Sequence, residues 1–150
     1  MSEDELAAAA DRIVDFYRTF RDCRVEDFRA LASAKVHWQD PFADVNGIEK
    51  VLANMHKWSE VLSDIRFELK DRSRTGKVLF LHMLMTFEVK RIPGKPQQID
   101  YVKKVVFDEA GLIVGAKEYW DATPALESVP LLGRCVGLAR RLMKKQLTAP

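Results

Sequence analysis

The stretch HWQDPFADVNGIEKV, residues 37–51, contains the end of one expected strand, a loop and the start of a helix. Val36 and Trp38 alternate with polar neighbours, which is typical of a strand with one buried face. Pro41 ends that strand, because proline cannot donate a ladder hydrogen bond and disfavours helical backbone in the residue before it. Asp40 therefore stands at the strand end, on the same face as Trp38.

Three helices are expected around this strand. The first begins at Ser2, with Glu5 placed to complete a capping box. A short helix fits residues 25–32. The third has Asn46 as its expected N-cap and continues to Leu62 with apolar residues at helical spacing.

Further strands are expected at 65–72, 77–90, 99–107 and 112–120, where apolar and polar residues alternate or turn residues bound an apolar run. The element order predicts an α+β fold, in which a cone-shaped, curved and mostly antiparallel sheet wraps around the N-terminal helices. An added helix is expected over about 125–147. The space between sheet and helices is the natural place for a small-molecule pocket.

The composition is that of a globular protein and excludes disordered and fibrous classes, with 47% hydrophobic and 31% charged residues in a chain of 150. A single domain over 1–150 is expected. Cys23 and Cys135 have no spacing typical of a disulfide framework or a zinc site, so reduced thiols, no metal and no cofactor are expected. An acidic N-terminus and the lack of a long apolar run predict a cytoplasmic protein without an integral membrane segment.

The charge is unevenly distributed, although the net charge is only +2. Residues 128–150 contain lysines and arginines and no acid. Two interpretations remain open: contact with an anionic partner, or the solvated face of a terminal helix. Nucleic-acid binding is not expected.

Two stretches together carry a family resemblance. HWQDPFADVNGIEKV (37–51) and VVFDEAGLIVGAKEYWDA (105–122), on this order of elements, resemble the nuclear transport factor 2-like superfamily and, within it, ketosteroid isomerase and the SnoaL-like proteins. The resemblance extends from Leu6 to about Ala122. It implies the same fold and a cavity for a hydrophobic carbonyl compound.

The resemblance also implies two catalytic positions. Asp40 matches the isomerase aspartate that moves a proton next to a carbonyl, and Tyr17 matches the tyrosine that donates a hydrogen bond to the developing oxyanion. For each residue a plainer interpretation stays open: Asp40 as a brace for the loop before Pro41, and Tyr17 as part of the apolar stripe of its helix.

Lys103 departs from the isomerase pattern, which has a protonated aspartate at this place. If DEAG (108–111) forms a four-residue loop, Lys103 lies opposite Ala116 and diagonal to Glu118. Two alternatives follow. Lys103 and Glu118 form an ion pair that leaves no free donor, or an unpaired Lys103 stabilises an enolate or binds a ligand carboxylate.

Aromatic and methionine side chains on the same side are candidates for the pocket wall, although part of this set must be core. The candidate ligand-binding residues are Trp38, Phe42, Met55, Trp58, Met83, Met85, Phe87, Tyr101, Lys103, Glu118 and Trp120. The opposite face of the 77–90 strand, around His82, is unusually apolar and is expected to form a homodimer interface.

Three functions are therefore considered. The first is an isomerase, lyase or cyclase acting on an apolar carbonyl compound, with Asp40 as base and Tyr17 as donor. The second is a ligand-binding protein of the same fold without catalysis. The third is a dimeric protein-interaction module.

Overall fold

The structure is a computed structural model that describes residues 2–21, 24–127 and 132–147. The chain groups into two compact units, residues 1–120 and 121–150, and each is described by itself. The expected single domain stays a prediction.

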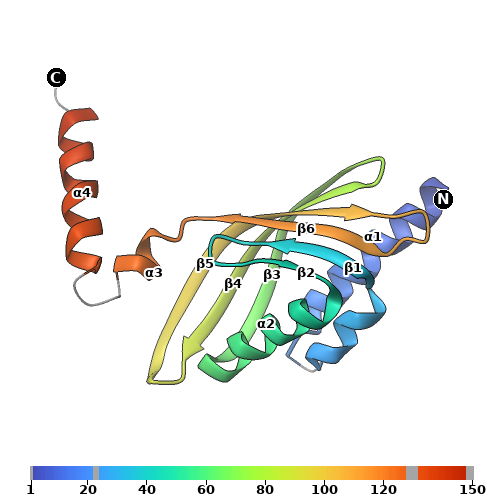
Figure 1. The fold of residues 1–150 in the computed structure, drawn as a ribbon, viewed down its shortest axis with the longest axis horizontal. Coiled ribbons are helices and arrows are strands. Elements are labelled where there is room, and N and C mark those ends of the chain that lie inside the picture. Colours follow the sequence, from blue (N-terminus) through green and yellow to red (C-terminus); the bar gives the residue numbers. More distant parts are fainter. Residues whose placement is uncertain (1, 22–23, 128–131, 148–150) are drawn as a thin grey trace. The chain divides into compact units, whose positions relative to one another are not determined.

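The first unit is a six-stranded sheet with helices on one side (Figure 1). The strand order is β2-β1-β6-β5-β4-β3, and every neighbouring pair is antiparallel except the parallel pair β1 and β6. The strands are β1 (Ala32–Gln39), β2 (Asp44–Asn46), β3 (Leu62–Thr75), β4 (Val78–Val89), β5 (Ile92–Phe107) and β6 (Ile113–Trp120). The helices are α1 (Glu3–Arg18), the 3-10 helix η1 (Val25–Ala30) and α2 (Ile48–Val61). The sheet curls around α1 and α2 without closing, which confirms the predicted α+β class with a curved, mostly antiparallel sheet.

Helix α1 begins as its sequence predicts. The Ser2 backbone N–H donates to Glu5 Oε2 at 2.6 Å, and the Glu5 N–H donates to Ser2 Oγ at 3.2 Å, so both halves of the capping box are present. Its apolar stripe includes Ile13, Phe16 and Tyr17, all buried in the core under the sheet. This helix therefore holds Tyr17 against the concave face of the sheet.

The entry to α2 differs from the prediction. Asn46 is not the N-cap; it ends β2 and pairs with His37, and Gly47 is the cap with φ +93°. The chain reverses after Asp40, pairs back along β1, and needs a left-handed residue to turn into the helix, which glycine adopts without strain. The predicted helix at 25–32 is a shorter 3-10 helix, because β1 already starts at Ala32.

Strand β5 is longer than predicted, since it starts at Ile92 instead of residue 99. The prolines in RIPGKPQ, which indicated a loop, lie in a part of β5 that pairs only with β4, because the pairing with β6 begins at Tyr101. Edge positions of this kind tolerate proline, whose missing N–H faces no partner strand. The turn residues therefore predicted a connection at a place where the structure has the edge portion of β5.

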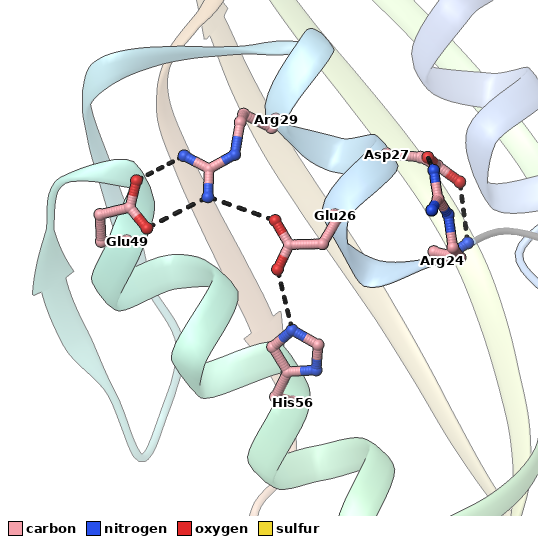
Figure 2. A network of polar contacts seen from close by, with 6 residues as sticks. All are labelled: Arg24, Glu26, Asp27, Arg29, Glu49 and His56. Atoms are coloured by element: carbon pink, nitrogen blue, oxygen red, sulfur yellow. Dashed lines mark hydrogen bonds and ion pairs between the residues drawn. The ribbon is translucent and has the colours of Figure 1, made fainter.

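A polar cluster joins η1 to α2 on the surface (Figure 2). The Arg29 guanidinium forms ion pairs with both Glu49 and Glu26, and Glu26 in turn lies 3.1 Å from His56 Nε2. His56, and then Arg29, lower the pKa of Glu26, while Arg29 lowers the pKa of Glu49. We call Glu26, Arg29, Glu49 and His56 the surface cluster.

The second unit consists of α3 (Thr123–Glu127) and α4 (Leu132–Leu147). The C-terminal helix is confirmed, with α3 in place of its predicted first turns; residues 128–131 lie outside the described part. Asp121 Oδ1 accepts a hydrogen bond from the Thr123 N–H at 2.8 Å at the start of α3. Within the described residues, no helix has the length and apolar character needed to span a membrane.

Candidate functional site

A cavity lies between the helices and the concave face of the sheet. It receives side chains from α1, α2, β1, β3, β4, β5 and β6, and most of them are apolar. The lining residues are Tyr17, Phe20, Trp38, Asp40, Asn54, Met55, Trp58, Ser59, Leu62, Ile65, Phe67, Met85, Ile99, Tyr101, Glu118 and Trp120.

The structure brings most of the sequence-predicted site residues together at this cavity. Those that line it are Tyr17, Trp38, Asp40, Met55, Trp58, Met85, Tyr101, Glu118 and Trp120. Four predicted residues are not among the described lining residues. Met83 is 1% exposed in the core, Phe87 lies further along β4, Phe42 is 49% exposed and packs edge-on against Trp120, and Lys103 is buried next to lining residues.

Sequence reasoning missed several wall residues: Phe20, Asn54, Ser59, Leu62, Ile65, Phe67 and Ile99. Three of them carried a usable strand signal. Ile65 and Phe67 are on the apolar face of the expected strand 65–72, and Ile99 lies two residues before Tyr101, so all three share a strand face with the pocket side. Asn54 and Ser59, next to Met55 and Trp58 on α2, gave no comparable signal. The side chains of a helix that face a cavity are spread over a broad arc instead of a single row.

Lys103 forms the centre of a buried polar group with Tyr17 and Glu118, which we call the buried cluster. Its ammonium donates a hydrogen bond to the Tyr17 hydroxyl and lies 2.8 Å from Glu118 Oε1. The same nitrogen lies 4.0 Å from the centroid of the Trp38 ring, which adds a cation–π contact. Of the two alternatives left open for Lys103, the structure has the ion pair.

The charges in this cluster stabilise one another against the cost of burial. Burial alone would lower the pKa of Lys103, but Glu118 and then Tyr17 raise the pKa above its ordinary value. Burial raises the pKa of Tyr17, and the positive charge of Lys103 only partly offsets this effect. At neutral pH Lys103 is therefore an ammonium and Tyr17 a neutral phenol.

The strand register differs from the prediction, and the difference explains the pairing. Phe107 pairs with Ile113 instead of Leu112, and a further irregularity between Val106 and Phe107 puts Lys103 directly opposite Glu118. The loop expectation assumed a regular hairpin, but the longer loop and the bulge each shift the register by one residue, so the partner of Lys103 changes by two residues. Direct opposition on one face brings the two side chains into contact.

Asp40 both braces the loop after β1 and lines the cavity. Its Oδ1 accepts hydrogen bonds from the backbone N–H groups of Phe42 at 2.7 Å and Ala43 at 2.8 Å, so the carboxylate braces the loop after β1. The residue also lines the cavity. One oxygen is engaged by the loop, and among the described residues no hydrogen bond to Oδ2 is found.

Two acidic residues, Asp40 and Glu118, are among the described residues that line the cavity. Glu118 is on β6, which pairs in parallel with β1, and Asp40 follows directly after β1. In the parallel pair, Trp38 faces Ala116 and Gln39 faces Lys117. The mostly apolar wall therefore carries two acidic side chains from neighbouring strands.

The histidines form pairs away from this cavity. His37 Nε2 lies 2.6 Å from Asp44, and His82 Nε2 lies 2.7 Å from Asp100 on the other face of the sheet. Across residues 2–21, 24–127 and 132–147, no group of three or more His, Cys, Asp or Glu side chains is arranged to hold a metal ion.

Trp38 Nε1 is buried and has no hydrogen-bond partner in the described structure.

Comparison with solved structures shows the same fold at low sequence identity. An NTF2-like protein of unknown function from Burkholderia pseudomallei K96243 has a TM-score of 0.72 at 13% identity, covering 87% of this chain and 99% of its own. A protein assigned to the SnoaL-like polyketide cyclases, from Jannaschia sp. CCS1, has a TM-score of 0.72 at 12% identity, with coverage of 87% and 96%. A protein with a ketosteroid isomerase-like fold from Catenulispora acidiphila DSM 44928, solved with trimethylamine, has a TM-score of 0.68 at 12% identity, with coverage of 76% and 88%.

Sequence comparisons assign the family. A search of curated proteins found no match. The model of the SnoaL-like domain, in contrast, matches residues 13–116, which extend from α1 to the middle of β6. The matched range includes Tyr17, Asp40 and Lys103. By this match over most of its length, the chain belongs to the family of SnoaL-like domains.

Proposed function

We propose that the protein binds a small, largely apolar carbonyl compound in this cavity and acts on it as an isomerase, lyase or cyclase through proton transfer. The observation that carries the proposal is that the Asp40 carboxylate and the Tyr17 side chain line the same apolar cavity. The membership in the SnoaL-like family and the cyclase assignment of the Jannaschia protein are consistent with this class of reaction.

In the proposed step, Asp40 removes a proton from the carbon next to the carbonyl group. The electron pair of that C–H bond moves toward the carbonyl oxygen, which becomes negatively charged, and the proton is returned from Asp40 to a carbon of the product. The Tyr17 hydroxyl is the donor for this oxygen. Because Lys103 donates to the Tyr17 oxygen, the hydrogen of the hydroxyl is left for the ligand.

A second candidate function is ligand binding without catalysis. The pairing of Lys103 with Glu118 favours it, since this pair neutralises the cation at the position where the isomerases have their second oxyanion donor. Asp40 then serves as the loop brace alone. The two candidates predict the same binding and differ in turnover.

The experiment follows exchange of the α-protons of 2-tetralone in D2O by proton NMR, with binding measured separately by tryptophan fluorescence. The wild type should accelerate exchange, and Asp40→Asn should reduce the rate by roughly 10²- to 10⁴-fold. Asparagine keeps an acceptor oxygen for the Phe42 and Ala43 N–H groups, so the loop is retained. Asp44→Asn is the matched control, because Asp44 pairs with His37 and Gln39 and is not among the described lining residues.

The possible outcomes separate the candidates. Saturable binding of 2-tetralone without accelerated exchange supports the ligand-binding function and contradicts catalysis. Equal exchange rates for the wild type and Asp40→Asn exclude Asp40 as the base. The absence of saturable binding contradicts both candidates.

We also propose that two copies associate through the outer face of the sheet. Phe80, Val102 and Tyr119 lie on adjacent strands of this face and are 39%, 38% and 50% exposed, an arrangement that supports an apolar interface. Sedimentation velocity should find a dimer that Val102→Asp converts to monomer. A monomeric wild type at micromolar concentration would contradict the proposal.

A further inference from the structure

We propose that the ligand of the cavity carries a positively charged nitrogen, so that its class is a protonated apolar amine. This inference rests on the proposed function only in using the same cavity as a binding site. It adds the charge of the ligand, which neither the family nor the fold specifies.

The wall of the cavity is rich in aromatic rings. Indole, phenol and phenyl rings have a negative face, and a cation near such a face is attracted more strongly when water is excluded. Aliphatic side chains would bind a neutral hydrocarbon without this preference. The rings that line the cavity come from six different elements and include Tyr17, Trp38, Trp58, Phe67, Tyr101 and Trp120.

The charges that line the cavity are negative. Asp40 and Glu118 both line it, and none of the described lining residues is a lysine, arginine or histidine. Lys103 compensates the charge of Glu118, so the net negative charge is that of Asp40, and the apolar walls screen its field only weakly. An anionic ligand is repelled there, and a cationic one is attracted.

Two lysines contact lining residues, and neither leaves an uncompensated positive charge among the described lining residues. Lys103 is bonded to Glu118 and Tyr17, so its charge is compensated by a carboxylate. Lys90 donates to the Ser59 carbonyl oxygen at 2.7 Å and is not one of the described lining residues. Asp40 has hydrogen bonds only from backbone N–H groups and no ion pair within the described chain, so its negative charge is left for the ligand.

The test uses three ligands of nearly equal shape: naphthalen-2-ylmethylamine, 2-methylnaphthalene and 2-naphthoate. Their dissociation constants for the wild type are measured at pH 7 by fluorescence titration. The amine should bind about tenfold more tightly than the neutral compound, the ratio expected of a desolvated cation beside rings and a carboxylate, and the naphthoate should bind most weakly. This order needs no variant and therefore does not depend on how a substitution affects folding.

Asp40→Asn should reduce the advantage of the amine over 2-methylnaphthalene to about threefold or less, since it removes the lining carboxylate that has no ion pair within the described chain. Asp44→Asn should leave the advantage unchanged, because Asp44 is on β2 and is not a described lining residue. A merely structural role of Asp40 would weaken all three ligands together and leave their ratios intact.

Three results would overturn the inference. Tight binding of the neutral compound with no preference for the amine contradicts the charge assignment and leaves the proposed function standing. Preferential binding of 2-naphthoate contradicts it more directly. Saturable binding of none of the three ligands also contradicts the inference, while the separate titration with 2-tetralone decides whether the proposed function stands.

Discussion

The buried cluster and the surface cluster join elements that are distant in sequence by the same chemistry, but they do so in different surroundings. In the buried cluster, Lys103 on β5 connects Glu118 on β6 to Tyr17 on α1, and its side chain is 2% exposed. In the surface cluster, Arg29 on η1 connects to Glu49 on α2, and its side chain is 46% exposed (Figure 2). The number of contacts in a polar cluster therefore does not determine how much the cluster contributes to the stability of the folded state.

Exposure to solvent determines this contribution to stability. At the surface, water screens the ion pairs and can replace either partner, so losing one partner costs little. In the interior, each charge has already lost its hydration and depends on the other for stabilisation. The buried cluster should therefore be sensitive to the loss of one partner and insensitive to the loss of both.

The largest effect is expected from Lys103→Ala. This substitution leaves the Glu118 carboxylate next to an apolar void, and removing one partner of a buried pair costs about 3–5 kcal/mol in the free energy of unfolding. Urea unfolding followed by tryptophan fluorescence measures it. A loss below about 1 kcal/mol, typical of an exposed pair, would contradict the description of this cluster as desolvated.

The double variant Lys103→Met with Glu118→Leu is the control for this prediction. It removes both charges and refills the volume with apolar atoms, and such replacements are often neutral or stabilising. The double variant should therefore recover most of the stability lost in Lys103→Ala. Recovery of stability without recovery of ligand binding would show that the pair of Lys103 and Glu118 contributes more to ligand binding than to the stability of the fold.

The second effect is a loss of stability at alkaline pH. Burial raises the pKa of Tyr17 and of Tyr101 above the ordinary value of 10.0, so both keep their protons in the folded state when the unfolded chain has lost them. A raised folded-state pKa gives stability that is complete below the unfolded pKa and is lost as the pH rises. Above pH 10, the free energy of unfolding should fall by up to about 1.4 kcal/mol per pH unit for each tyrosine.

A pair of tyrosine variants tests the origin of this slope. Tyr101→Phe removes one buried phenol and should make the decline between pH 10 and 11.5 less steep. Tyr17→Phe removes the other buried phenol and should flatten the decline in the same way. A decline as steep as that of the wild type in both variants would contradict the assignment to burial.

Much of the fold could be predicted because local signals agreed with one another. The capping box at Ser2, the stop at Pro41 and the alternation in β4 depend on neighbouring residues, and each was found as expected. The errors fell where tertiary pairing overrides local preference. Asn46 was drawn into β2, and the prolines of RIPGKPQ lie on a sheet edge that the sequence does not reveal.

The sequence predicted which residues line the cavity better than it predicted how their side chains contact one another. Strand parity places Trp38, Tyr101 and Glu118 on one face, and all three line the cavity. The direct opposition of Lys103 and Glu118 depends on a bulge before Phe107, which no residue type in that hairpin signals. Whether a residue lies at the cavity surface or just behind it, as Lys103 does, depends on packing from α1 and cannot be read from strand parity.

The smallest effect is expected from Glu49→Gln in the surface cluster. Arg29 lowers the pKa of Glu49, so this contact stabilises the folded state above the ordinary pKa and its contribution is lost as the pH falls through the lowered value. Because Glu49 is exposed, water and salt screen the interaction, and the urea midpoint at pH 7 should move no further than it does in Glu60→Gln, a matched change on the same helix. A shift comparable to that of Lys103→Ala would mean that Arg29 connects η1 to α2 more rigidly than an exposed ion pair can, and the contrast between the two clusters would then depend on connectivity instead of burial.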